Sequence, residues 1–227
     1  MRIDLITAVP DLLDSPLKTS IIKRAQDKGK LSLNIHNLRD YAYNKHKQID
    51  DKPFGGGPGM VLKPEPFFEC IESLQSENKY DRIIFTTPKG KIFNQKVAND
   101  LSLSKKIIII AGHYKEIDDR VRQKFATDEI SIGNFVLTGG ELPALIIIDA
   151  IVRLLPGVLN DSEAALDDSF QDGEIVEAPY FTRPAEYRGM KVPEILLSGN
   201  EKEIDKWKEE QSKILTKKWR EYNSAKS

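Results

Sequence analysis

The sequence predicts an α/β fold built on a mostly parallel sheet. Short segments rich in isoleucine and valine alternate with segments of helical periodicity through residues 1–155. Strands that are apolar on both faces are typical of a parallel sheet wrapped by helices. The expected strands cover residues 3–9, 31–37, 82–86, 106–111 and 129–132, and the expected helices cover residues 17–28, 64–74, 94–103, 117–125 and 141–155. We expect the strand at 82–86 to stop at Thr87-Pro88-Lys89-Gly90.

The helix expected over residues 141–155 is apolar on nearly every side. A surface helix would keep a polar face, so this helix needs a cover all round, from its own domain or from a second subunit. We favour a homodimer.

The chain divides into three parts by composition. We expect a first domain over residues 1–160, an acidic interdomain linker over 161–178 and a small C-terminal helical domain over 179–227. The C-terminal helix is indicated by apolar residues that recur at helical spacing. These residues are Ile204, Trp207, Ile214, Leu215 and Trp219.

Composition excludes several classes of protein. Hydrophobic residues make up 40% and charged residues 30% of the 227 residues, as in a globular protein. No apolar run is long enough to span a bilayer and the first residues read as a strand rather than a signal peptide, so we expect a cytoplasmic protein without membrane contact. The single Cys70 excludes an internal disulfide and a multi-cysteine metal site.

The net charge is −1, but the charge is unevenly distributed. Residues 17–47 are rich in Lys and Arg, whereas residues 161–177 carry Asp and Glu without any Lys or Arg. A ligand rich in phosphate is attracted by the first segment and repelled by the second, unless a carboxylate there has a chemical role.

Glycine occurs in loops that follow three of the expected strands. Ligands of open α/β sheets bind beyond the carboxyl ends of the strands, so the loops at 86–90, 111–114 and 132–140 are expected to converge on one ligand, such as an adenine-type cofactor. The common signatures of a P-loop, a dinucleotide fold, a zinc protease and a serine hydrolase are absent. The three histidines are isolated from one another.

Residues 53–60, P-F-G-G-G-P-G-M, form a loop dominated by glycine and proline. Glycine lets another molecule approach the backbone closely, and proline restricts the conformation of the loop. Such a loop suits a surface against which a flat ring or a phosphate lies, although a plain mobile loop explains the same composition.

Collinear motifs across essentially the whole chain resemble one family. They are D-D-K-P-F-G-G-G-P-G-M-V (50–61), T-P-K-G (87–90), A-G-H-Y-K-E-I-D-D-R-V (111–121), S-I-G-N-F-V-L-T-G-G-E-L-P-A (131–144), R-L-L-P-G-V-L (153–159), D-S-F (168–170), T-R-P (182–184) and V-P-E-I-L-L-S-G (192–199). In order and spacing they are similar to the bacterial tRNA (guanine-N1)-methyltransferases of the TrmD family, which belong to the SPOUT superfamily.

The resemblance implies a fold, an activity and partners. The fold would contain a deep trefoil knot, and the enzyme would be a homodimer whose active sites lie at the subunit interface. S-adenosylmethionine would donate a methyl group to N1 of the guanine immediately 3′ of the anticodon (position 37) in tRNA. Participation of a magnesium ion is left open, and no metal-ligating residue is assigned.

The resemblance also implies the residues that bind the cofactor, mostly through the main chain. They are Thr86, Pro88, Gly90, Gly112, Tyr114, Ile132, Gly133, Asn134, Phe135, Val136, Leu137, Gly139 and Gly140. Tyr114 and Phe135 have an alternative interpretation as core aromatics.

Two residues match the family's catalytic positions. Asp168 matches the proposed general base, which removes the proton from guanine N1. Arg153 would stabilise the negative charge that spreads to O6 as that proton leaves. The alternatives are a solvated linker carboxylate for Asp168 and a structural salt bridge for Arg153.

RNA contacts are expected on the glycine-rich loop and in the C-terminal part of the chain, with the basic helix at 17–30 as a weaker candidate. The expected residues are Gly55, Gly56, Gly57, Gly59, Ser169, Arg183, Lys191, Ser198, Gly199 and Asn200.

The sequence departs from the family pattern at His113, where arginine is usual, at Lys115, where an acidic residue is usual, and at Glu116, where glycine is usual. Tyr180-Phe181 stands in place of His-Tyr. Two other interpretations therefore stay open: an RNA-binding dimer without catalytic activity, and a related knotted enzyme that acts on another nucleotide.

Overall fold

The computed structural model describes residues 1–159, 168–171 and 173–224. The chain separates into two compact units, Met1–Asn160 and Asp161–Ser227. Of the acidic linker expected at 161–178, residues 161–167 and 172 lie outside the described residues. No helix in the described part of the chain is both long enough and apolar enough to cross a membrane.

The first unit is built on a five-stranded parallel sheet, which confirms the mixed α/β class expected from the sequence. The strands lie in the order β2 (Ser32–Asn37), β1 (Arg2–Thr7), β6 (Lys106–Ala111), β5 (Arg82–Ile92) and β8 (Asp128–Ser131). Every pair of neighbouring strands is parallel. The carboxyl ends of all five strands therefore lie at the same edge of the sheet, where ligands of such folds bind.

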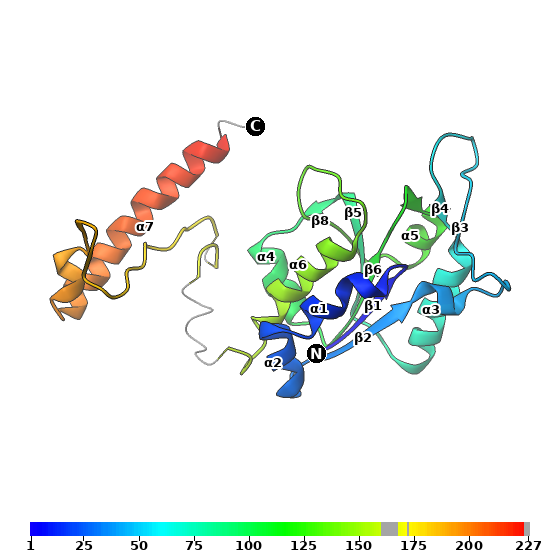
Figure 1. Ribbon diagram of the computed structural model, residues 1–227, viewed down its shortest axis with the longest axis horizontal. Helices are drawn as coiled ribbons and strands as arrows, with labels where there is room; N and C mark the ends of the chain where they lie inside the picture. The colour runs from blue at the N-terminus through cyan, green and yellow to red at the C-terminus, as the bar shows by residue number, and fades with distance from the viewer. Residues whose placement is uncertain (160–167, 172, 225–227) are drawn as a thin grey trace. The chain divides into compact units, whose positions relative to one another are not determined.

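Helices cover both faces of this sheet (Figure 1). One face carries α1 (Asp14–Leu17), α2 (Ser20–Asp27), α4 (Gln95–Ser102) and α6 (Glu141–Val152), and the other face carries α3 (Pro64–Glu77) and α5 (Asp119–Phe125). Short 3-10 turns at Pro10–Leu13 (η1) and Leu38–Tyr41 (η2) complete the connections.

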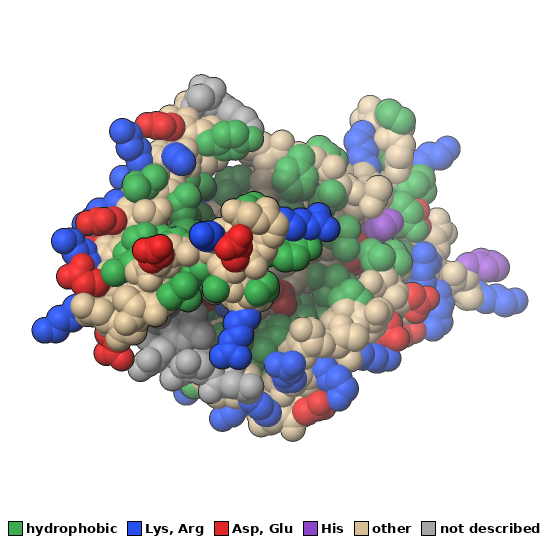
Figure 2. Space-filling view, turned by 60° about the vertical axis from the view of Figure 1, so that its left-hand side comes forward, with side chains coloured by type: hydrophobic (Ala, Val, Ile, Leu, Met, Phe, Trp, Pro, Cys, Tyr) green, Lys and Arg blue, Asp and Glu red, His purple; other side chains and the backbone are tan. Residues whose placement is uncertain are grey.

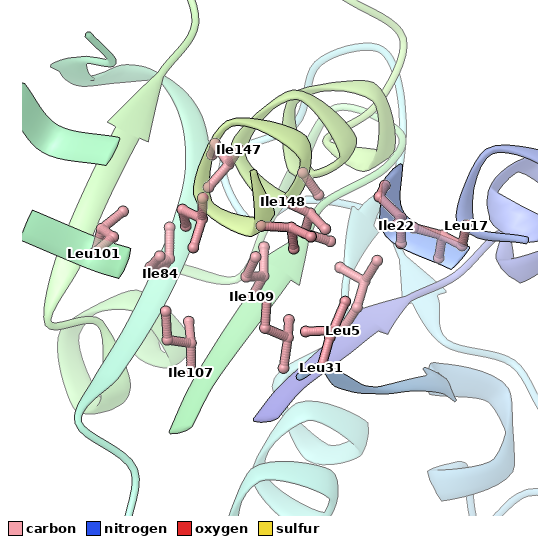
Figure 3. Packing of buried hydrophobic residues seen from close by; sticks show 14 of the residues in the cluster. Leu5, Leu17, Ile22, Leu31, Ile84, Leu101, Ile107, Ile109, Ile147 and Ile148 are labelled. Atoms are coloured by element: carbon pink, nitrogen blue, oxygen red, sulfur yellow. The ribbon is translucent and has the colours of Figure 1, made fainter. Parts of the chain in front are cut away.

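Successive residues of the central strand β6 enter two different hydrophobic cores. Ile107 and Ile109 pack under α6, whereas Ile108 and Ile110 pack under α3 and α5. Figure 3 shows Ile147 and Ile148 of α6 above the side chains of the sheet. Because side chains alternate across a strand, an unbroken isoleucine run is what burial on both faces requires.

Several expected element boundaries are wrong: the strand expected over 3–9 ends at Thr7, the helix expected over 17–28 begins at Ser20, and the helix expected over 141–155 ends at Val152. Strand β5 does not stop at Thr87 but continues to Ile92, because Thr86 and Lys91 both pair with Ile130 and the residues between them bulge out of the ladder. The helix expected from residue 117 begins at Asp119, since Glu116–Ile117 forms the short strand β7.

The glycine-rich loop is the tip of a β-hairpin. Strands β3 (Asp50–Asp51) and β4 (Val61–Leu62) pair in antiparallel fashion, and β4 also pairs in parallel with β7. The loop extends from this hairpin in Figure 1. Gly57 adopts a φ of +106°, a conformation that residues with a Cβ rarely adopt, so the turn depends on glycine.

The second unit contains one long helix and a small hairpin. Helix α7 (Glu201–Ser224) follows the 3-10 turn η3 (Glu194–Leu197), and β9 (Glu186–Tyr187) pairs with β10 (Met190–Lys191). Trp207 and Trp219 of α7 contact Phe181 and Phe170, respectively. The apolar stripe of α7 therefore holds the preceding segment against the helix.

A buried carboxylate stabilises the first unit. Asp4 of β1 is fully buried, and its oxygens accept hydrogen bonds from Arg2 Nε at 2.7 Å and Tyr80 Oη at 2.8 Å, with His36 Nε2 at 2.9 Å. Burial by itself would raise the pKa of Asp4, but the hydrogen bonds from His36, Arg2 and Tyr80 outweigh it and hold the pKa below its ordinary value.

We expect Asp4→Asn to lower the free energy of unfolding by about 2 kcal/mol near neutral pH, since the charged acceptor is lost. Because the pKa of Asp4 is lower in the folded chain than its ordinary value of 3.8, the charged carboxylate stabilises the fold at pH values above 3.8. This stabilisation is lost as the pH falls further. The difference between the two proteins should therefore shrink below about pH 4 in urea titrations. Asp27→Asn, which removes an exposed pair with Lys23, is the control and should change little. A difference that is the same at neutral and acidic pH would contradict this account.

Candidate functional site

A pocket lies at the carboxyl edge of the sheet, where the loops after β5, β6 and β8 meet. It is lined by Thr86, Thr87, Pro88, Gly112, His113, Tyr114, Lys115, Glu116, Ile130, Ser131, Ile132, Gly133, Phe135, Val136, Leu137, Thr138, Gly139, Gly140 and Pro143. Segments far apart in the sequence thus surround one volume, at the position where parallel α/β sheets bind their ligands.

Most of the residues expected at the cofactor line this pocket, with the exception of Gly90 and Asn134. A Cβ on Gly90 would lie 2.5 Å from Glu129 C and Ile130 N of β8, so this glycine permits close approach of two strands. Ile130, Ser131 and Pro143, which the sequence analysis did not assign to the cofactor, also line the pocket, together with His113, Lys115 and Glu116, which it named as departures from the family pattern. All of these residues lie within or directly beside the motifs at 111–121 and 131–144, and that proximity is the sequence signal that could have assigned them to the site.

Two neighbouring glycines allow the loop before α6 to pack on the strand ends. A Cβ on Gly140 would overlap Thr86 Oγ1 and lie 2.9 Å from Gly112 N, and Gly140 N donates a hydrogen bond to Gly112 O at 2.7 Å. A Cβ on Gly139 would overlap Glu141 Oε2. These glycines therefore let the loop before α6 pack directly against the ends of β5 and β6, which holds the pocket-lining loops together.

The buried carboxylate of Glu141 connects the start of α6 to two loops. Glu141 is fully buried; its Oε1 accepts a hydrogen bond from Thr7 Oγ1 at 2.8 Å, and its Oε2 lies 3.3 Å from His113 Nδ1. The carboxylate thereby ties the end of β1 to the pocket-lining imidazole.

We expect Thr7→Val to lower the free energy of unfolding by about 1–3 kcal/mol, because the change leaves the buried Glu141 carboxylate without this donor. Valine has nearly the shape of threonine, so the loss reports the hydroxyl and not a cavity. Thr7→Ser keeps the hydroxyl and serves as the control in thermal and urea unfolding. Equal stability of the valine and serine variants would contradict the role of this hydrogen bond.

Charged side chains bridge the loops on the open side of the pocket. Lys89 Nζ lies 2.9 Å from Glu116 Oε2, and this carboxylate raises the pKa of Lys89. Tyr114 has a φ of +61°, an unusual conformation for a residue with a side chain, and Arg39 Nη2 donates to its Oη at 3.4 Å. Glu116 is thus neutralised, while Tyr114 is held at the rim.

The structure does not bring the two expected catalytic residues to this pocket within the first unit. Arg153 follows the last residue of α6, and this helix begins at the pocket and runs for 12 residues, which separates Arg153 from the pocket by about 18 Å along the axis. Asp168 belongs to the second unit.

The expected RNA residues fall into two groups. The glycines of the loop at 53–60 are exposed in the first unit. In the second unit Ser169 Oγ accepts a hydrogen bond from Glu177 N, and Ser198 Oγ accepts one from Asn200 N at 3.1 Å. Arg183, Lys191 and Gly199 are exposed there as well.

The described residues contain no group of three or more His, Cys, Asp or Glu side chains that could hold a metal ion. The magnesium ion left open by the sequence therefore has no assigned ligands in this part of the chain.

The sequence analysis expected α6 to be covered either by its own domain or by a second subunit. Within the first unit α6 is not covered on all sides, which contradicts the first of these expectations. Leu142 and Ile146 are 46% and 47% exposed, although Ile147 and Ile148 beside them are fully buried. The neighbouring loop exposes Val136 at 84%. An apolar surface therefore extends from the rim of the pocket along α6.

The parallel sheet and the pocket at its carboxyl edge, lined by the loops after β5, β6 and β8, define an α/β protein with a candidate ligand site at the strand ends. A family model described as tRNA (Guanine-1)-methyltransferase TrmD matches residues 1–224. The chain belongs to this family of tRNA methyltransferases, which confirms both the resemblance and the enzyme class expected from the sequence.

Relatives named tRNA (guanine-N(1)-)-methyltransferase match the chain over nearly its whole length. The protein of Bacteroides fragilis is 55% identical over 220 residues, which is 97% of each chain. The protein of Flavobacterium psychrophilum is 55% identical over 217 residues, 96% of each chain. The protein of Chlorobium chlorochromatii is 51% identical over 230 aligned positions, 97% of this chain and 99% of its own.

Proposed function

We propose that this chain transfers a methyl group from S-adenosylmethionine to N1 of the guanine immediately 3′ of the anticodon (position 37) in tRNA. The observation that carries the proposal is the convergence of the loops after β5, β6 and β8 on one pocket, in a chain that belongs to the tRNA (guanine-1)-methyltransferase family. The names of the relatives support guanine N1 as the methylated atom.

The pocket suits S-adenosylmethionine. Gly112, Gly139 and Gly140 line the pocket, and main-chain groups of the three loops would offer hydrogen bonds to an adenine ring. Phe135 and Leu137 are half-exposed at the rim and would cover apolar parts of the ligand. The cofactor supplies an electrophilic methyl group, so the chain itself has to position the guanine and remove its proton.

Asp168 and Arg153 are the residues that we assign to this chemistry. N1 of guanine bears a proton, and a carboxylate of Asp168 within hydrogen-bond distance would accept it. Negative charge then spreads to O6, where the guanidinium of Arg153 would stabilise it.

We propose that two copies of the chain complete each active site. The length of α6 keeps Arg153 about 18 Å from the pocket of its own unit, so a second copy is needed to supply it. The exposed Leu142 and Ile146 on the same helix offer the apolar surface that a stable homodimer would bury. The family's trefoil knot, formed around the same three loops, belongs to this proposal too.

We place the tRNA on the glycine-rich loop and on the exposed polar residues of the second unit. The bare backbone from Gly55 to Gly59 allows a base that has left the stack to lie against it. Arg183 and Lys191 would contact phosphates and so position the RNA.

The test is mass spectrometry of nucleosides from an unmodified tRNA transcript, after incubation with the protein and S-adenosylmethionine that carries a deuterated methyl group. We expect labelled 1-methylguanosine from a transcript with guanine at position 37 and none from a transcript with adenine there. Binding of tRNA without methylation would favour the RNA-binding dimer instead. Label in both transcripts would favour an enzyme that acts on another nucleotide.

A further inference from the structure

The rim of the pocket carries two cations that the catalytic scheme does not use. Lys115 lines the pocket, and Arg39 donates to the Tyr114 hydroxyl beside it. Among residues 1–159, 168–171 and 173–224, neither side chain has a carboxylate within ion-pair distance, whereas Lys47 is paired with Asp40 and Lys89 with Glu116. Both cations are therefore available to an anionic ligand.

The glycine-rich loop determines where the Lys115 side chain lies. The pairing of β4 with β7 places Lys115 directly beside the end of this loop, and Lys115 N donates to Met60 O at 3.1 Å. A Cβ on Gly59 would lie 3.3 Å from Lys115 Cβ, and one on Gly57 would lie 3.6 Å from Lys115 Nζ. The aliphatic stem thus packs along the loop and carries the ammonium group between the loop and the pocket.

Arg39 is held on the other side of Tyr114. Its Nη1 donates to Lys47 O at 3.3 Å and its Nη2 donates to Tyr114 Oη at 3.4 Å. These acceptors are neutral, so the guanidinium keeps its full charge. The left-handed conformation of Tyr114 separates the two neighbouring side chains, with the ring turned toward Arg39 and the next residue turned toward the glycine-rich loop.

The distribution of charge on the surface makes RNA binding depend on individual Lys and Arg side chains. The chain has a net charge of −1, and on the face shown in Figure 2 the Lys and Arg side chains are interspersed with Asp and Glu side chains. Phosphate contacts are therefore expected where a cation lacks an acidic neighbour and adjoins the site.

We propose that Lys115 and Arg39 bind phosphate groups of the RNA strand whose target base enters the pocket. This inference rests on the proposed function and adds residues that hold the substrate. The two cations lie at the exposed rim and beside the bare glycine backbone, which leaves room for a sugar-phosphate chain. A role in binding the donor's carboxylate is disfavoured because a positive charge close to the donor would oppose its sulfonium group.

The test measures binding of an unmodified tRNA transcript to Lys115→Gln and Arg39→Gln at several salt concentrations. Glutamine keeps the Cβ, Cγ and Cδ atoms that pack on Gly59, so this packing is retained while the ammonium group at residue 115 is removed. We expect each variant to bind the transcript about tenfold more weakly. The slope of log K against log salt should become shallower by about 0.7 to 0.9 per variant.

The controls separate this inference from the proposed function. Lys105→Gln removes an exposed charge just before β6, at the opposite edge of the sheet, and should leave RNA binding unchanged. Lys115→Arg keeps the charge and should restore binding. The affinity for S-adenosylmethionine, measured by calorimetry, should be unchanged in Arg39→Gln and Lys105→Gln, whose altered side chains do not line the pocket.

Unchanged RNA affinity and salt dependence in both glutamine variants would overturn the inference, and so would weaker donor binding with unchanged RNA binding. Either result leaves the proposed function intact if the unaltered protein methylates the transcript. Absence of methylation by the unaltered protein overturns the proposed function instead, and the salt dependence still decides whether these cations contact RNA.

Discussion

Replacing Asp168 with asparagine is expected to lower the rate of methyl transfer by about 10²- to 10⁴-fold. The amide is nearly the same size as the carboxylate but cannot accept the proton that leaves guanine N1. Binding of S-adenosylmethionine should be unchanged, because the role assigned to Asp168 is to accept the proton of guanine N1 and not to hold the donor. The measurement is single-turnover methylation of an unmodified transcript, with donor binding followed by calorimetry.

Glu174→Gln is the matched control for this change. It removes a carboxylate from the same acidic segment, one that is exposed and lies 3.5 Å from Arg220 Nε, and it should methylate like the unaltered protein. Comparable rates for Asp168→Asn and the unaltered protein would remove Asp168 from the mechanism. Loss of donor binding together with activity would point to a structural role instead.

Replacing Gly90 with alanine is expected to cost about 3 kcal/mol of unfolding free energy. The added Cβ would lie 2.5 Å from Glu129 C and Ile130 N, which are backbone atoms of β8 and cannot turn aside. Relief of this clash requires β5 and β8 to separate. Because Ile130 and Ser131 line the pocket, donor affinity should fall as well.

Gly112→Ala provides the comparison for Gly90→Ala. A Cβ at Gly112 would meet only the end of the Ile117 side chain, at 3.2 Å, and a side chain can shift. We expect a loss below about 1.5 kcal/mol in urea unfolding for this variant. Equal losses of unfolding free energy in Gly90→Ala and Gly112→Ala would show that the pairing of β5 with β8 does not depend on the close packing of Gly90.

The sequence predicted the features that depend on local pattern. The isoleucine run at 107–110 identified a buried strand, and the glycines after the strands identified the edge where the pocket lies. These predictions follow from side-chain alternation and from the geometry of parallel sheets. Both can be recognised from the residues of each strand and the loop that follows it.

Features that depend on distant contacts were not predictable. Thr7 and Glu141 form a hydrogen bond although 134 positions separate them, and nothing in either segment indicates its partner. The continuation of β5 past Pro88 depends on Ile130 pairing twice. The packing of Lys115 along the glycine-rich loop depends on the pairing of β4 with β7, strands that are too short to leave a sequence pattern.

Hydrogen exchange measured by mass spectrometry, with and without S-adenosylmethionine, tests most directly whether the three loops bind one donor. We expect residues 86–90, 112–116 and 131–140 to gain protection together, at the same midpoint of donor concentration, while helix α3 (Pro64–Glu77) on the far face of the sheet is unchanged. Protection of a single loop, or of none at saturating donor, would contradict the assignment of this pocket.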